Sequence, residues 1–329
     1  ELYIGLEHLD SGSLRVTRWG SKVALKGDKL VMRKGDILFG RRNTYLRRVA
    51  IAPHDGLFSA HGMILRAKTE RINSEYLPFF IASDYFMDEA IRISVGSLSP
   101  TVNWKELKEL EFTIPTLEAQ EKLTKTLIAA NDLKEKYEEL LAITDDLVKS
   151  QFIEMFDFED LTLSNPSNNF SKKCYDDTSS ATKVAAEYYQ KSGRYAIYDQ
   201  SQDCNIAGFT DSEEGLCYNY PAVLFGDHSR VVKYINQPFY IGADGVKIIR
   251  PKEEDLLPEF LYYDLLYHNI PNTGYNRHFK YVKMLRLTEA TIDKQKQFLQ
   301  IAHQADKSKF ELKQCIENID KVIKSLING

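Results

Sequence analysis

The chain has 329 residues, of which 43% are hydrophobic and 27% charged, and its formal net charge is −4. This length supports two domains together with long helices, and no apolar run approaches the roughly 18 residues that a membrane span needs. The sequence has no signal-peptide pattern. Its four cysteines form no CxxC pair and no cluster with histidine, so neither a zinc site nor a disulfide framework is indicated. A reducing cytoplasm is the expected location.

Residues 1–116 predict a first α+β domain. The stretch 75–93 is expected to be helical, and 107–114 is expected to form a last strand before Pro115. Short apolar runs that are punctuated by Gly, Asp and Pro predict the other strands, at residues 29–32, 36–39, 49–52 and 62–66.

A long spacer helix is predicted over residues 117–156. Its apolar side chains recur at alternating steps of three and four, which is the a/d pattern of a coiled-coil seam. The positions expected to pair with another helix are Leu123, Ala130, Leu133, Tyr137, Leu140 and Leu147.

Residues 157–292 predict a second α+β domain, and residues 293–329 a second spacer helix. The strands are expected at 222–225, 231–235, 239–241 and 246–249, with a helix at 258–267. The second helix carries the same seam pattern about 175 positions later, with pairing positions Phe298, Ile301, Ala305, Leu312, Ile319 and Val322. Two ordinary amphipathic helices on unrelated cores are the alternative.

The order of elements therefore predicts an internal repeat, in which two globular domains are separated by two helices that pair as an antiparallel coiled coil with a pseudo-twofold axis. At about 1.5 Å per residue, some 35 residues make a spacer of roughly 50 Å. Residues 1–7 best match 195–201, so we expect about 30 to 40 residues of the first domain to be missing, through either a cut or a shortened gene. A chain shortened in this way could form a homodimer.

Candidate nucleic-acid contacts lie in two loops of the first domain. Phosphate contact needs cations, and Arg and Asn offer paired groups for base edges. A plain solvated loop is the alternative reading. The candidates are Arg41, Arg42, Asn43, Tyr45, Arg47 and Arg48 in the most basic cluster, and Ser97, Ser99 and Thr101 in a loop after Gly96.

The second domain is net acidic, and its bulk charge does not favour DNA binding. Two of its loops correspond to those of the first domain and carry local candidates. Aromatic core filling is the alternative for the second of these loops. The candidates are His228, Arg230 and Lys233, and then Tyr275, Asn276, Arg277, His278 and Lys280.

Three segments carry a family resemblance. They are Tyr3–His8, Lys34–Phe39, and the run from Gly96 to Glu121 with its Ile114-Pro115-Thr116-Leu117-Glu118-Ala119-Gln120-Glu121 helix head. The chain resembles the specificity subunits of type I restriction-modification systems. The second copy departs from the helix-head motif at 292–297, where only Gln295 is retained.

The resemblance implies that each domain recognises one half of a bipartite site in double-stranded DNA. It also implies that the helices dock two modification (methyltransferase) subunits and, through them, restriction or translocase subunits. No methyltransferase tetrad and no phosphate-binding loop is present in the sequence, so we expect a non-catalytic chain. We expect it to bind no metal and no cofactor of its own, with S-adenosylmethionine on the modification subunit. A scaffold that does not read DNA is the alternative.

Overall fold

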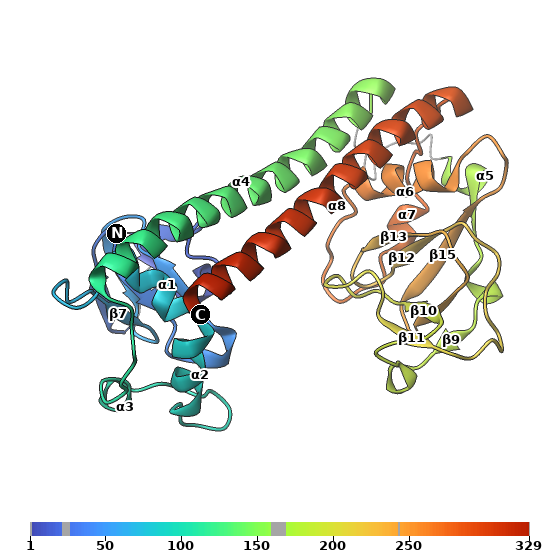
Figure 1. The fold of residues 1–329 in the computed structure, drawn as a ribbon. Helices are drawn as coiled ribbons and strands as arrows, with labels where there is room; N and C mark the ends of the chain where they lie inside the picture. The colour runs from blue at the N-terminus through green and yellow to red at the C-terminus, as the bar shows by residue number, and fades with distance from the viewer. Residues whose placement is uncertain (1, 22–26, 159–168, 243, 329) are drawn as a thin grey trace. The chain divides into compact units, whose positions relative to one another are not determined.

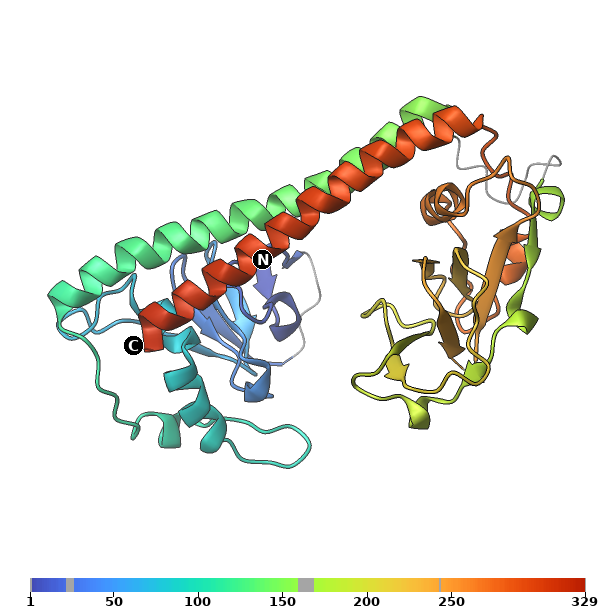
Figure 2. The same ribbon diagram turned by 45° about the vertical axis from the view of Figure 1, so that its right-hand side comes forward.

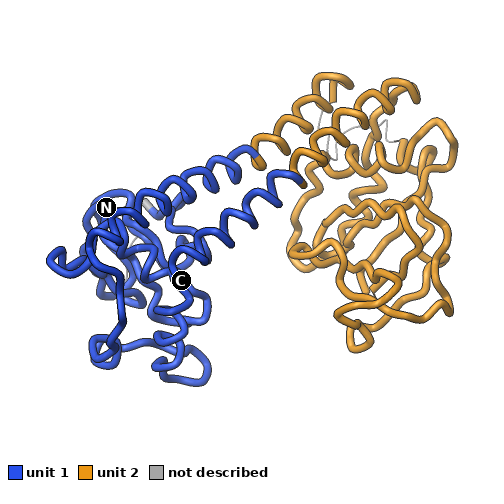
Figure 3. Tube along the Cα trace, in the orientation of Figure 1, with its two compact units in different colours: residues 1–140, 311–329 blue, residues 141–310 orange. Residues whose placement is uncertain are grey.

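Figure 1 shows the computed structural model, which describes residues 2–21, 27–158, 169–242 and 244–328. The chain divides into two compact units, coloured in Figure 3. Unit 1 comprises residues 1–140 and 311–329, and unit 2 comprises residues 141–310. Each unit combines a globular α+β part with segments of two long helices, which confirms the predicted fold class.

The globular part of unit 1 contains two small sheets. The first has the order β2-β1-β6-β3, with β1 and β6 parallel and the other pairs antiparallel. The second has the order β5-β4-β7 and is antiparallel. The strands are β1 (Leu2–Ile4), β2 (Gly20–Ser21), β3 (Lys29–Met32), β4 (Ile37–Phe39), β5 (Val49–Ile51), β6 (Gly56–Ser59) and β7 (Met63–Leu65).

Helices complete this part of unit 1. The predicted helix at 75–93 is divided at Ser83, whose side-chain oxygen accepts a hydrogen bond from Phe86 N and starts a new helix. The helical elements are η1 (Leu6–His8), η2 (Thr44–Leu46), α1 (Leu77–Ala82), α2 (Asp84–Arg92) and α3 (Trp104–Leu107).

The prediction of a strand at 107–114 is wrong, because the described backbone there forms no sheet pairing. The segment is irregular, yet its apolar side chains still contribute to the core. Phe112 packs against Phe80 and Phe86, at ring-centroid distances of 5.3 and 5.4 Å. The apolar pattern therefore reports burial rather than a strand.

Unit 2 repeats the two-sheet plan, with orders β13-β12-β15-β8 and β11-β10-β14-β9. In the second sheet β10 and β9 both lie parallel to β14. The elements are α5 (Phe170–Lys173), β8 (Cys174–Asp176), η3 (Thr178–Ser180), β9 (Lys183–Val184), η4 (Ala186–Tyr188), β10 (Tyr195–Tyr198), β11 (Gly208–Thr210), β12 (Ala222–Gly226), β13 (Val232–Ile235), β14 (Phe239–Gly242), β15 (Val246–Pro251), α6 (Pro258–Tyr267) and α7 (Phe279–Val282).

Strands β4 and β12 occupy the same place in the two units. Each is buried on both faces, with alternate side chains entering different hydrophobic clusters. Ile37 and Phe39 enter one cluster while Leu38 enters another. Burial on both faces explains why these strands are continuous apolar runs rather than alternating ones. Each strand leads directly into a loop that is central to the candidate site.

The two predicted long helices are present as α4 (Leu117–Phe156) and α8 (Ile292–Asn328). They run side by side in Figure 1 and Figure 2. In unit 1, Lys134 Nζ lies 2.8 Å from Asp320 Oδ1, and in unit 2, Lys309 Nζ lies 2.9 Å from Asp145 Oδ1. Within each unit, the segments of the two helices run antiparallel.

The contact face of α4 lies one residue later than the predicted seam. Thr124, Leu127, Val148 and Phe152 are buried there. Lys134 lies on the same face of α4, between Leu127 and Val148 in the sequence. Its ion pair with Asp320 shows that this face is turned toward α8.

The predicted pairing positions therefore divide into two groups. The exposed group, for which the predicted pairing is wrong, is Leu133, Leu140, Leu147 and Val322. The buried or half-buried group is Leu123, Ala130, Tyr137, Phe298, Ile301, Ala305, Leu312 and Ile319. No helix in the described ranges is long and apolar enough to cross a membrane.

Candidate nucleic-acid interface

In unit 1, the loop after β4 and the loop after α2 lie against each other, although more than 50 residues separate them in the sequence. Val102 N donates to Arg41 O at 2.9 Å, and Asn43 N donates to Pro100 O at 2.7 Å. An isolated bridge also pairs Arg42 with Thr101. The structure thus brings together the two segments of the first domain that the sequence analysis selected. We call them the unit 1 loop pair, residues 41–48 and 96–101.

Backbone turns shape the first of these loops. Asn43 and Arg47 have φ values of 54° and 50°, in the left-handed region that non-glycine residues seldom adopt. They flank η2, and the Thr44 hydroxyl donates to Arg41 O at 2.8 Å. This tight turn leaves the Tyr45 ring largely exposed.

The arginines of this loop have different surroundings. Arg42 is exposed, and its Nη2 donates to Ser99 Oγ at 3.3 Å. Arg47 instead turns toward α2, where its guanidinium pairs with Asp84 at 2.7 Å and with Asp88 at 2.5 Å. Arg42 is available to an anionic partner, whereas Arg47 already has two carboxylate partners.

The remaining candidates of unit 1 lie around Arg42. Ser97 is exposed in the turn, while Ser99 and Thr101 are half-buried, and the Thr101 hydroxyl donates to Ser99 O at 2.9 Å. Arg41 and Arg48 are half-buried. The Nε atom of Arg41 and the Oδ1 atom of Asn43 are buried and have no hydrogen-bond partner within the described structure.

In unit 2, the corresponding loops also lie together. His278 N donates to Asp227 O at 2.8 Å, and Phe279 N donates to the Asp227 carboxylate at 2.7 Å. The His228 ring stacks on the Tyr275 ring with centroids 4.8 Å apart and planes at 7°. We call these segments the unit 2 loop pair, residues 227–231 and 272–280.

This loop pair exposes planar and cationic side chains. Tyr275 is 91% exposed, and Asn276, Arg277 and Lys280 are exposed too. Lys280 Nζ lies 4.9 Å from the centroid of the Tyr281 ring. Arg230 is half-buried, with φ of 63°, and its Nη1 donates to Ile270 O at 3.0 Å.

Lys233 and His278 are buried, which corrects the expectation that they contact DNA directly. Lys233 is 4% exposed and donates to Cys204 O at 2.9 Å and Asn205 O at 3.1 Å. Burial lowers the pKa of Lys233, although Asp199 opposes this shift. The buried His278 ring has Nδ1 2.9 Å from Asp227 O and Nε2 3.3 Å from Thr273 N. Both side chains hold loops together instead.

A third loop of unit 2 was not selected from the sequence. Gln200 Oε1 accepts a hydrogen bond from His228 N at 3.1 Å, and Gln202 Nε2 donates to Ser229 O at 2.9 Å. The segment 199–205 therefore lies against the unit 2 loop pair. Its polar composition directly after a buried strand is the signal that could have identified it.

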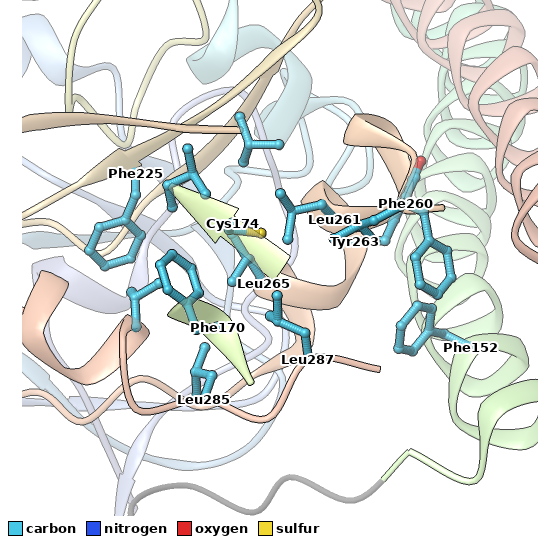
Figure 4. Packing of buried hydrophobic residues seen from close by; sticks show 14 of the residues in the cluster. Phe152, Phe170, Cys174, Phe225, Phe260, Leu261, Tyr263, Leu265, Leu285 and Leu287 are labelled. Carbon is cyan, nitrogen blue, oxygen red and sulfur yellow. The ribbon is translucent and has the colours of Figure 1, made fainter. Parts of the chain in front are cut away.

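The core of unit 2 supports this site. At the end of β12, Phe225 packs against Phe279 of α7, with ring centroids 6.2 Å apart. Figure 4 shows Phe225 in the same cluster as Phe152 of α4 and Phe260 of α6, whose rings are 5.4 Å apart. The candidate loops thus begin at strands and helices that are fixed by aromatic packing. Within the described ranges, no group of three or more His, Cys, Asp or Glu side chains could hold a metal ion.

Comparisons with known proteins agree with this geometry. A family model described as the type I restriction modification DNA specificity domain matches residues 9–141. No curated protein sequence matches the chain.

Three solved structures are similar to the chain, and each alignment covers 99% of it. A chain from a study of complex assembly and conformational transition in the type I R-M system has a TM-score of 0.51 and 16% identity, with 90% of that chain covered. The HsdS subunit from Thermoanaerobacter tengcongensis has a TM-score of 0.39, 16% identity and 89% coverage. The type I S subunit from M. genitalium has a TM-score of 0.48, 14% identity and 88% coverage.

The first of these structures supports the fold, and the family model identifies the DNA specificity domain. Residues 9–141 are thus similar to the type I restriction modification DNA specificity domain, and the chain shares its fold with a chain from a type I R-M system.

Proposed function

We propose that this chain recognises a two-part site in double-stranded DNA, with the loop pair of each unit reading one part. The observation that carries the proposal is the recurrence of the same arrangement. In each unit, a loop follows a strand that is buried on both faces and lies against a second loop from after the aromatic helices. One such pair would be an ordinary surface feature, but two equivalent pairs suit a target with two parts.

The exposed side chains of both loop pairs match the chemistry of a DNA surface. Arg42 can donate two hydrogen bonds to a guanine edge or contact a phosphate. In unit 2, Arg277 and Lys280 supply cations, and the Tyr275 ring supplies a planar surface beside them. These local cations provide the phosphate contacts even though the formal net charge of the whole chain is −4.

The long helices offer a surface for the modification subunits. Leu133 of unit 1, and Ile143 and Leu147 of unit 2, are 42%, 61% and 53% exposed on α4. Large apolar side chains that recur on an exposed helix face favour protein partners. We propose that two modification subunits bind the helices and carry S-adenosylmethionine, and that restriction or translocase subunits join through them. The four cysteines are all free, as expected in the cytoplasm.

The test is a binding selection with the chain co-expressed with a modification subunit. The purified complex is incubated with a random-core DNA library at two salt concentrations, and bound DNA is sequenced. We expect a two-part motif with one constant gap, and binding that weakens steeply with salt. The K122A complex, which lacks an exposed cation of α4 far from the loops in sequence, should select the same motif. A stable complex that enriches no motif would overturn the proposal and favour a scaffold.

A further inference from the structure

One buried glutamine occupies the same place in each unit. Gln120 lies in the first turn of α4 and Gln295 lies in the first turn of α8. They are 0% and 1% exposed, respectively. Buried polar groups in folded proteins are almost always hydrogen-bonded, and a glutamine amide has both an acceptor oxygen and two N–H donors to satisfy.

In unit 1, the Gln120 amide joins three segments. Its Oε1 accepts a hydrogen bond from Asn73 N at 2.7 Å, and its Nε2 donates to Pro115 O at 2.8 Å and to Arg71 O at 3.4 Å. The Asn73 side chain in turn accepts from Glu75 N at 2.7 Å, just before α1. The start of α1, the segment before α4 and α4 itself therefore meet at one side chain.

In unit 2, the Gln295 amide makes the equivalent three bonds. Its Oε1 accepts from Leu257 N at 2.9 Å, and its Nε2 donates to Ala290 O at 2.8 Å and to Asp255 O at 2.7 Å. Leu257 is the residue directly before α6. In both units, one carbonyl that accepts from the glutamine, Pro115 O or Ala290 O, lies five residues before it in the sequence. The other, Arg71 O or Asp255 O, lies two residues before the residue whose N–H donates to the glutamine.

A threonine completes the arrangement in each unit. Thr116 O accepts from Gln120 N at 2.8 Å, and Thr291 O accepts from Gln295 N at 3.0 Å. Their hydroxyls accept from Ala119 N and Lys294 N, at 3.3 and 3.4 Å. The neighbouring residues differ between the copies, since Pro115 and Glu121 correspond to Ala290 and Lys296. Each unit therefore keeps the glutamine and the threonine four residues before it, while the neighbouring residues differ.

We propose that Gln120 and Gln295 are positioning residues that fix the angle between each globular part and its own long helix. Among uncharged side chains, only the amides of Asn and Gln combine an acceptor oxygen with two N–H donors on one nitrogen, and Gln has the longer reach. The inference rests on the proposed DNA-reading function. It adds that these glutamines set the gap between the two half-sites, whereas the loop pairs set their sequences.

The experiment uses Q120M and Q295M, which keep the side-chain length and remove all three bonds. Each variant of the 329-residue chain is co-expressed with the modification subunit. The complex is selected on libraries in which the two half-sites are separated by every gap within several base pairs of the preferred one. We expect both half-site motifs to persist, the gap preference to broaden, and affinity at the preferred gap to fall about tenfold. The exposed neighbour K122M is the matched control and should keep the wild-type gap.

A second readout does not involve DNA. Hydrogen exchange of the Asn73 amide in Q120M, and of the Leu257 amide in Q295M, should rise about tenfold or more because their acceptor is lost. Exchange in strands β4 and β12 should stay at the wild-type rate. If Q120M and Q295M keep a gap preference as sharp as that of the wild type, the proposal is overturned. It is also overturned if hydrogen exchange rises throughout the unit, because that result marks a general role in folding. If the wild-type complex selects no two-part motif, the proposed function itself fails.

Discussion

Two arginines of one loop should respond in opposite ways to substitution. Arg42 is exposed, and its side chain makes one long hydrogen bond, 3.3 Å to Ser99, within the described structure. Arg47 is held by the Asp84 and Asp88 carboxylates. We expect R42A to weaken DNA binding without a change in folding, and R47A to weaken folding with little change in DNA binding.

The magnitudes follow from these surroundings. A bidentate arginine–base contact contributes about 1–3 kcal/mol of discrimination, so R42A should lower affinity roughly 5- to 150-fold and relax the preference at one base position. Its effect on the free energy of unfolding should stay within about 0.5 kcal/mol. The carboxylates around Arg47 are 43% and 66% exposed, so loss of both ion pairs should cost only about 1 kcal/mol.

The assays are DNA binding by fluorescence anisotropy at several salt concentrations and unfolding in urea. If Arg42 contacts a phosphate instead of a base, R42A should reduce the salt slope by about one without altering sequence preference. The reasoning is refuted if R47A loses as much DNA affinity as R42A while its unfolding curve matches the wild type. An unchanged affinity in R42A would refute it equally.

Three further predictions concern other parts of the molecule. Y275A should remove an exposed aromatic ring beside His228 and weaken DNA binding by about 1 kcal/mol or more, as loss of an aromatic side chain from a binding surface does. Electrophoretic mobility shifts measure this, and wild-type affinity would contradict it. F152A should destabilise unit 2 by about 3–5 kcal/mol because the ring is fully buried, and a urea midpoint equal to the wild type would be incompatible with that packing. Burial is the largest single influence on Asp36 and raises its pKa, but the hydrogen bonds and positive charges of Arg66 and Arg33 together outweigh it and leave the pKa lowered. The stabilising effect of this carboxylate should therefore be present at neutral pH and be lost as the pH falls below about 4. The stability difference between the wild type and D36N should shrink on that acidification, and a constant difference would argue against the ion pair.

Elements with strong apolar signals could be predicted from the sequence. Strands β12 and β15 and helix α6 lie where the apolar runs indicate. In β12, burial on both faces leaves an unbroken apolar stretch. The short strand β1 and the two-residue strand β9 were missed. Their pairing depends on neighbours far along the chain, with β9 paired to β14 more than 50 residues later.

The coiled-coil seam shows how a correct period can still give the wrong face. Leu133 and Leu147 follow the a/d spacing, yet they are exposed and the inward face lies one residue later. That face includes Lys134, whose partner Asp320 lies 186 residues away. Hydrophobic periodicity cannot anticipate an inward position that is filled by an ion pair.

The candidate site was partly predictable for a related reason. The sequence identified both loops in each unit. Cations and aromatic residues marked the loops at 41–48 and 275–280, and correspondence between the two copies marked the loops at 96–101 and 228–230. It could not separate exposed from buried polar residues. Lys233 can be buried because its Nζ donates to the carbonyl of Cys204, and His278 because its Nδ1 lies at hydrogen-bond distance from the carbonyl of Asp227. Both partners are distant in sequence, and no local pattern encodes them.

The central claim is that each unit reads its own part of one DNA site. The most direct measurement is a DNA selection with the R42A and Y275A complexes beside the wild type, scored separately for each half of the motif. We predict that R42A alters base preference only in one half, that Y275A alters it only in the other, and that the gap is the same in all three. Variants that alter the same half, or that leave both halves unchanged, would contradict the account.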